Sequence, residues 1–78
     1  MKAWVKNQLI PYMTLKHPNR KHSVYRVKHI AEKQLGRYVS QEELQAVLAA
    51  HGYPISNYYP ISESFFKEDI NHERNNEA

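Results

Sequence analysis

A helix with both ends specified by local residue types constrains this chain more than any other feature. Ser40 and Glu43 have the spacing of a capping box, in which the serine oxygen accepts a hydrogen bond from the backbone N–H three residues later. Val39 and Leu44 stand at the positions of a hydrophobic staple across the same turn. The sequence therefore predicts that a helix begins directly after Ser40.

The end of this helix is also marked. Gly52 suits the left-handed position that follows a helix, and Tyr53 after it can pack back on Leu48, as in a Schellman motif. Pro54 prevents the helix from continuing. The predicted helix buries an apolar stripe made of Leu44, Val47, Leu48 and one of Ala49 and Ala50.

A second amphipathic helix is predicted over residues 24–35. Ser23 is a suitable N-cap, and Gly36 stands where a helix-ending glycine belongs. Tyr25, at the edge of the apolar face, is interpreted as a packing residue. The apolar residues recur at helical spacing and form one stripe, which consists of Val24, Val27, Ala31 and Leu35 with Ile30 beside it.

Together these elements indicate a mainly α protein with a small single domain. The chain has 78 residues and no cysteine, which excludes a disulfide framework, cysteine zinc sites and thiol catalysis. The short connection from Gly36 to Ser40 predicts a helix-turn-helix-like pair. Residues 53–62, rich in Tyr and Pro, are expected to form a short extended segment, either an edge hairpin serving as a wing or an ordered loop.

The two ends of the chain carry weaker signals. In residues 1–15, either a short helix that ends at Ile10, before a proline, or a strand over residues 12–15 fits the pattern. The expected domain covers residues 1–70, and residues 71–78 are expected to be a flexible polar tail. A last short helix is expected before that tail, with Ser62 or Ser64 as its cap and Phe65, Phe66 and Ile70 as its apolar residues.

The formal net charge of +3 conceals an uneven distribution. Residues 1–37 hold nine basic groups and one acid, a net of +8, whereas residues 38–78 hold two basic groups and seven acids, a net of −5. Such asymmetry suggests an anionic partner for the basic half. The alternative is that the two halves fold on each other and partly neutralise. Both interpretations stay open at this point.

A nucleic-acid interface is the first candidate site. Residues 16–22 form a basic loop without an apolar residue, and the outer face of the helix over 24–35 is basic as well. Gln41 and Gln45 have the side chain that reads adenine in the major groove, if the second helix is a recognition helix. The candidate residues are Lys16, Arg20, Lys21, His22, Arg26, Lys28, Lys33, Arg37, Gln41 and Gln45.

One feature opposes docking of the second helix on DNA. Glu42 and Glu43 stand at its start and would face a polyanion at an electrostatic cost. In the alternative arrangement this helix is scaffold, and the basic loop and the first helix make the contact. A pair of helices with a turn is also frequent in proteins that bind no nucleic acid.

The sequence supports neither catalysis nor a cofactor. His17, His22 and His29 do not form a metal-binding pattern, and no HExxH motif occurs. We expect no enzyme activity, no cofactor and no metal. No apolar run is long enough to span a bilayer, and the N-terminus lacks the apolar core of a signal peptide, so a cytoplasmic protein without membrane contact is expected.

A set of spaced residues extends from His22 to Ser62. It consists of His22-Ser23, Tyr25, Lys28-His29, Glu32, Gly36, Tyr38-Val39-Ser40, Gly52-Tyr53 and Ile61-Ser62. This pattern, which covers about residues 17–67, resembles a module in short proteins of bacteriophages and mobile elements. No activity is established for that module. Its members usually have an aromatic residue in the second helix, where this chain has Leu44.

The resemblance implies a setting, the cytoplasm of a host bacterial cell. Small phage proteins are commonly DNA-binding regulators, so the first expectation is a regulatory protein that binds double-stranded DNA or another anionic partner. A homodimer is left open, because paired half-sites call for two-fold symmetry. The second expectation is an inhibitor of a host protein complex, such as a restriction or CRISPR effector, which would contact its target through Tyr58, Tyr59, Glu63, Glu68 and Asp69.

Overall fold

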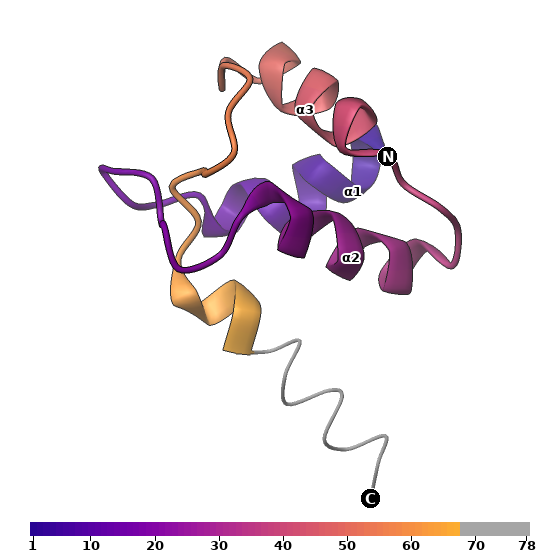
Figure 1. Cartoon of the computed structure of the whole chain (residues 1–78), viewed down its shortest axis with the longest axis horizontal. Helices are drawn as coiled ribbons and strands as arrows, with labels where there is room; N and C mark the ends of the chain where they lie inside the picture. Colours follow the sequence, from indigo (N-terminus) through magenta and orange to yellow (C-terminus); the bar gives the residue numbers. More distant parts are fainter. Residues whose placement is uncertain (68–78) are drawn as a thin grey trace, which may run out of the picture.

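Four helical regions and the irregular segments between them make up the fold (Figure 1). The predicted last helix begins at Glu63, directly after Ser62, and is described as far as Lys67. The computed structural model describes residues 1–67, and within this range the chain is mainly helical and contains no strand. The polar tail, the end of the last helix, Glu68 and Asp69 lie outside the described residues. No helix within residues 1–67 is long and apolar enough to cross a membrane.

The helix α3 (Gln41–Ala50) forms as the capping signals predict. The Ser40 hydroxyl oxygen accepts a hydrogen bond from the Glu43 N–H at 3.0 Å, and both residues of the predicted staple are fully buried. At the other end, the Gly52 N–H donates to the Ala49 carbonyl and the Tyr53 N–H donates to the Leu48 carbonyl, each at 3.0 Å. These two bonds confirm the Schellman motif, for which Gly52 adopts a φ of 91°.

The helix α2 (Val24–Leu35) has the predicted boundaries. Gly36 ends it in the left-handed conformation, with φ of 67°, and its N–H donates to the Glu32 carbonyl at 2.9 Å. The start of α2 differs from the predicted serine cap. Ser23 has the extended backbone of an N-cap, but its side chain makes no capping hydrogen bond. The Val24 N–H instead donates to the Asn57 carbonyl at 2.7 Å, so a distant segment satisfies this end of the helix.

The N-terminal segment is helical over a longer range than predicted. It consists of α1 (Lys2–Trp4), a π-helical turn η1 (Val5–Leu9) and a 3₁₀ turn η2 (Ile10–Tyr12). The strand considered over residues 12–15 is wrong. The π-helical turn η1 ends with Ile10 as its C-cap, at the predicted helix end, but the 3₁₀ turn η2 continues the helical segment to Tyr12. Pro11 is tolerated because it lies in the first turn of η2, where its missing N–H leaves no hydrogen bond unmade.

The Tyr/Pro-rich residues 53–62 form an ordered loop and not a hairpin. This loop runs antiparallel to residues 12–24 and is joined to them by backbone hydrogen bonds (Figure 1). A regular ladder cannot form there, because Pro60 has no N–H to donate. The other backbone bonds run from the Ser62 N–H to the Tyr12 carbonyl, from Leu15 to Pro60 and from Asn19 to Tyr59. The structure therefore does not show the predicted wing.

Every segment contributes side chains to one core. Tyr59 is 3 % exposed, and its hydroxyl accepts a hydrogen bond from the Ser56 N–H at 3.2 Å. Of the two adjacent tyrosines, Tyr59 therefore faces the core, which removes it from the candidate protein contacts. The predicted burial of Phe65 and Phe66 is confirmed, and the largest fully buried side chains are Phe66, Leu9, Ile30, Leu44, Leu48 and Ile61.

Candidate nucleic-acid interface

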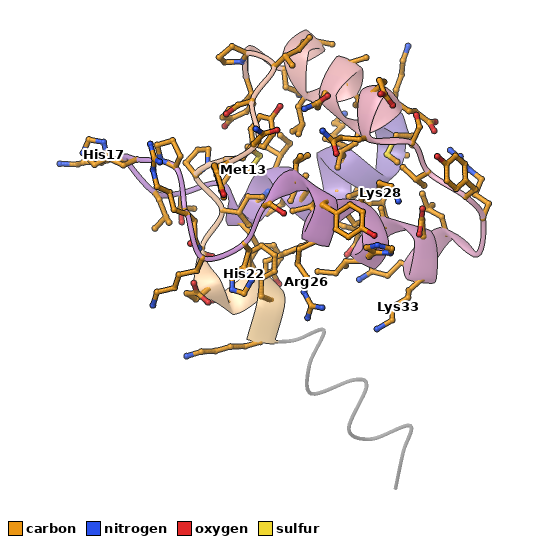
Figure 2. The ribbon with its side chains drawn as sticks, viewed as in Figure 1. Met13, His17, His22, Arg26, Lys28 and Lys33 are labelled. Atoms are coloured by element: carbon orange, nitrogen blue, oxygen red, sulfur yellow. The ribbon has the colours of Figure 1, made fainter. Side chains whose placement is uncertain are left out.

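The basic loop (residues 16–22) projects from one end of the molecule (Figure 2). Lys16, His17, Arg20 and Lys21 are all exposed, and His17 lies at the outermost point of the loop. Within residues 1–67, no ion pair involves Lys16 or Lys21. The loop thus presents cations to the solvent, at the end of the molecule that lies far from the N-terminus (Figure 1).

Asn19 holds this loop in one conformation. It is buried among charged neighbours, and its backbone N–H donates to the Tyr59 carbonyl at 2.9 Å. Its side-chain Nδ2 donates to the Ile61 carbonyl at 2.9 Å and to a carboxylate oxygen of Glu63 at 3.1 Å. Its Oδ1 accepts from the Lys21 N–H at 3.0 Å. The cations on either side of Asn19 are therefore attached to a fixed backbone.

The neighbours of Asn19 are also held. The Arg20 guanidinium lies 5.8 Å from the centre of the Tyr58 ring, which is a cation–π contact. The ring of His22 stacks on Phe66, with centroids 3.8 Å apart, and its Nε2 lies 3.1 Å from Glu63. Hydrogen bonds from Asn19 first and from His22 second lower the pKa of the Glu63 carboxyl. Glu63 is thus bound within the fold, and half-exposed at most.

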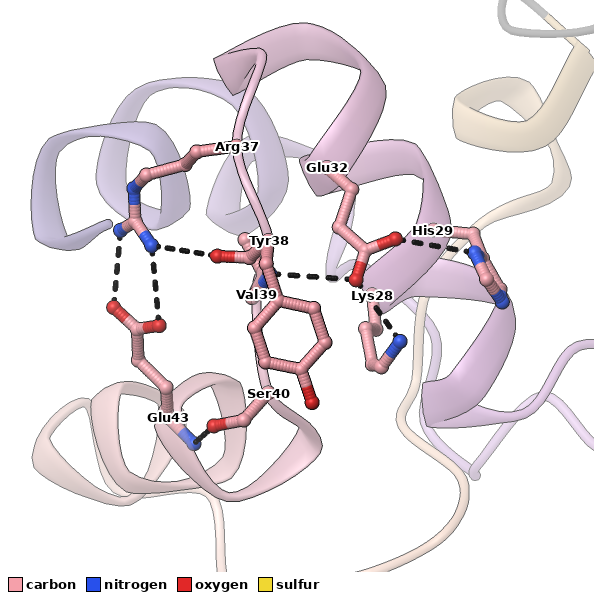
Figure 3. Close-up of polar contacts among 8 residues, drawn as sticks. All are labelled: Lys28, His29, Glu32, Arg37, Tyr38, Val39, Ser40 and Glu43. Atoms are coloured by element: carbon pink, nitrogen blue, oxygen red, sulfur yellow. Dashed lines mark hydrogen bonds and ion pairs between the residues drawn. The ribbon is translucent and has the colours of Figure 1, made fainter.

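Internal partners also neutralise two acids near α2 and α3 (Figure 3). A bidentate contact from Arg37, at 3.0 and 3.3 Å, occupies the Glu43 carboxylate and lowers its pKa. The Glu32 carboxylate accepts from Lys28 at 3.0 Å, which lowers the pKa of Glu32. It also contacts His29 and accepts from the Val39 N–H.

The acidic side chains of residues 1–67 therefore neutralise few of the exposed basic side chains. Residues 1–67 hold ten basic groups and four acids, a net of +6. Glu32, Glu43 and Glu63 have the internal partners described above, and Glu42 lies exposed on α3. The second half of the chain does not neutralise the basic loop within the part that the structure describes, except for the single carboxylate of Glu63.

The predicted cations of α2 fall into two groups. Arg26 and Lys33 lie along the lower edge of the helix in Figure 2, and each makes a contact within the protein. The Lys28 side chain is only 12 % exposed, and its ammonium group is bound to Glu32. The ammonium group of Lys28 is thus already paired, and the guanidinium of Arg37 is paired with Glu43.

The predicted base-reading residues of α3 are not placed for that role. Gln45 is buried, and its Nε2 donates to the Ser56 carbonyl at 2.9 Å. It ties α3 to the loop that follows and is not available to a base edge. Gln41 is half-buried at the start of the helix, next to the exposed Glu42.

Sequence reasoning missed two exposed aromatic residues. Tyr25, interpreted above as a packing residue, is 57 % exposed, and Tyr38 is 74 % exposed. The interpretation of Tyr25 is wrong because the apolar stripe of α2 runs along the opposite side of the helix. A helical projection that placed Tyr25 about 100° from Val24 would have found this exposure.

Among residues 1–67, no group of three or more histidine, aspartate or glutamate side chains is placed to hold a metal ion. No family model matches the chain, and no curated protein or solved structure was found to match it.

Proposed function

We propose that this chain is a small nucleic-acid-binding protein that holds phosphate groups with its basic loop. The observation that carries the proposal is the fixed conformation of that loop, in which Asn19 is pinned to residues 59–63 while Lys16, Arg20 and Lys21 are exposed. Because the backbone that carries the cations is already fixed, less conformational entropy is lost when the loop binds a ligand. Lysine and arginine side chains in such an array release counterions when they bind a phosphate backbone.

The geometry favours the loop over α3 as the contact element. The exposed side chains of α3 include Glu42 and three alanines, and no basic residue lies on this helix. A polyanion would find no positive charge on α3, whereas three cations are exposed on the loop. In this proposal α3 is scaffold, which is the second of the two arrangements considered from the sequence.

The setting of the proposal comes from the resemblance described above. A regulatory role in a phage or mobile element, within a bacterial cell, would suit a small protein with this charge. The proposal does not depend on that setting, because phosphate binding by the loop can be measured with the protein alone.

A pair of double variants with the same change in charge tests the proposal. Arg20→Gln with Lys21→Gln removes two positive charges from the loop. Lys2→Gln with Lys6→Gln removes two exposed positive charges near the N-terminus, at the other end of the molecule (Figure 1). Fluorescence anisotropy of a labelled oligonucleotide then reports the affinity of each variant over a range of salt concentrations.

The loop variant should bind much more weakly. It should reduce the slope of log K against log salt by about 1.4 units for a single strand, or about 1.8 units for a duplex, because two phosphate contacts are lost. The N-terminal variant should keep nearly the slope of the unmodified protein. Equal losses in the two variants would show only a non-specific effect of net charge, and would refute a role of the loop. Thermal unfolding followed by circular dichroism verifies that both variants fold.

A further inference from the structure

Two exposed tyrosines lie near each other on a surface that the proposed phosphate contacts do not use. Tyr25 belongs to the first turn of α2, and Tyr38 belongs to the connection between α2 and α3. They are 57 % and 74 % exposed, so neither ring is part of the core. We call this surface the Tyr25–Tyr38 patch, and it includes the side chains of Lys28 and His29 between and beside the rings.

Lys28 connects the two rings. Its ammonium group lies 5.2 Å from the centre of the Tyr25 ring and 5.5 Å from that of Tyr38. Glu32 fixes the position of this ammonium group at 3.0 Å, as Figure 3 shows together with the ring of Tyr38. The His29 ring meets the Tyr25 ring edge to face, with centroids 4.4 Å apart. The two tyrosines are therefore exposed but held in place. A ligand that stacks on them loses little binding free energy to the ordering of their side chains.

The patch follows the basic loop along the chain, although Figure 2 shows Lys28 of the patch well away from His17 at the tip of the loop, so one strand would extend along α2 to reach both. The loop ends at His22, and Tyr25 follows three residues later in the first turn of α2. Exposed aromatic rings and a row of cations on one protein are the combination that binds single-stranded nucleic acid, because the phosphates meet the cations and the bases stack on the rings. A duplex keeps the faces of its bases inside its own stack, so it cannot use the rings in this way.

We infer that the preferred ligand is a single-stranded nucleic acid whose unpaired bases stack on the Tyr25–Tyr38 patch while its phosphates bind the basic loop. A nucleic acid is the ligand that complements the charge of the protein, because residues 1–67 carry a net charge of +6. This inference rests on the proposed function, since it assigns the class of nucleic acid whose phosphates the basic loop binds.

The experiment compares a labelled single strand of about 12 nucleotides, within the usual site size for such proteins, with the duplex of the same sequence. Anisotropy is measured at about 50 mM salt, where phosphate contacts are strong. Tyr25→Leu with Tyr38→Leu removes both rings, and Tyr25→Phe with Tyr38→Phe keeps them. Ile55→Ser is the control, because Ile55 is 73 % exposed in the loop after α3 and has no ring.

The unmodified protein should bind the single strand more tightly than the duplex. The leucine variant should lose about fivefold or more of its single-strand affinity for each ring that contacts a base, and bind the duplex as before. The phenylalanine variant and Ile55→Ser should retain the single-strand affinity, which separates stacking from a general effect of surface change. Circular dichroism shows whether each variant is folded.

Two results overturn the inference and differ in what they say of the proposed function. If the leucine variant binds the single strand as well as the unmodified protein, while Arg20→Gln with Lys21→Gln does not, stacking is refuted and phosphate binding by the loop stands. If the unmodified protein binds neither nucleic acid, both proposals are refuted.

Discussion

Removal of the Asn19 side chain is the sharpest perturbation of the basic loop, because it changes no charge. Asn19→Ala deletes the bonds from Nδ2 to the Ile61 carbonyl, at 2.9 Å, and to a Glu63 carboxylate oxygen, at 3.1 Å. It also deletes the bond from the Lys21 N–H to Oδ1, at 3.0 Å. Ile61 is buried, so its carbonyl is left without this partner. The loop is then expected to lose the conformation that positions Arg20 and Lys21.

The size of the effect follows from these three bonds. A buried polar group that loses its partner costs about 1–3 kcal/mol, and a more exposed hydrogen bond contributes about 0.5–1.5 kcal/mol. The free energy of unfolding should therefore fall by at least about 2 kcal/mol. For a domain of this size, that corresponds to a decrease in Tm of roughly 10–20 °C.

Thermal unfolding followed by circular dichroism measures the first effect, and oligonucleotide anisotropy well below the Tm measures the second. Asn7→Ala is the matched control, because Asn7 is an exposed asparagine on η1. Asn19→Ala should bind nucleic acid more weakly even where it is fully folded, whereas Asn7→Ala should change neither property. An Asn19→Ala protein with an unchanged Tm and unchanged affinity would refute the claim that this side chain holds the loop.

Three further predictions concern the helices and the effect of pH. Gly36→Ala should lower the free energy of unfolding by about 1–2 kcal/mol in a denaturant titration, because Gly36 has a φ of 67° that alanine adopts only with strain; an unchanged midpoint would contradict this. Ser40→Ala should cost about 1 kcal/mol, since it removes the 3.0 Å cap on Glu43, and Ser64→Ala, at an exposed position, is its control. The folded-state pKa of Glu63 is lowered from 4.5, so its stabilising contribution is present above that value and is lost as the pH falls through the lower pKa. The Tm should therefore decrease on acidification below about pH 4.5, and less in Glu63→Gln; an equal decrease in both proteins would exclude Glu63 as a cause.

The two long helices could be predicted because their signals are local. The cap at Ser40 and the glycine at position 52 act within one turn of the helix ends that they specify, and both are found in the structure. The same applies to Gly36, whose left-handed conformation ends α2. Local hydrogen bonds of this kind require only neighbouring residues, so the sequence is sufficient to identify them.

The loop and the N-terminal segment could not be predicted in the same way. The bonds that fix Asn19 join residues 42 and 44 positions apart, and no local pattern indicates such a pairing. The end of the first helical segment depends on the π-helical and 3₁₀ turns around Pro11, and not on the proline alone. Tyr59 and Gln45 are both buried through contacts with Ser56, which sequence spacing does not reveal.

For the candidate site, the sequence identified the cations and not their arrangement. The exposure of Lys16, Arg20 and Lys21 in one loop agrees with the absence of apolar residues there. Ion pairs reduce the number of unpaired candidate cations, since Lys28 and Arg37 are bound to glutamates. Ion pairs between side chains from different segments depend on the fold, and therefore appear only in the structure.

The salt dependence of binding by the unmodified protein tests the central claim most directly. Anisotropy of a labelled single strand is titrated at several salt concentrations between about 50 and 200 mM. If Lys16, Arg20 and Lys21 each hold one phosphate, log K should fall against log salt with a slope of about −2. A slope near zero, or no binding at the lowest salt concentration, would contradict the account.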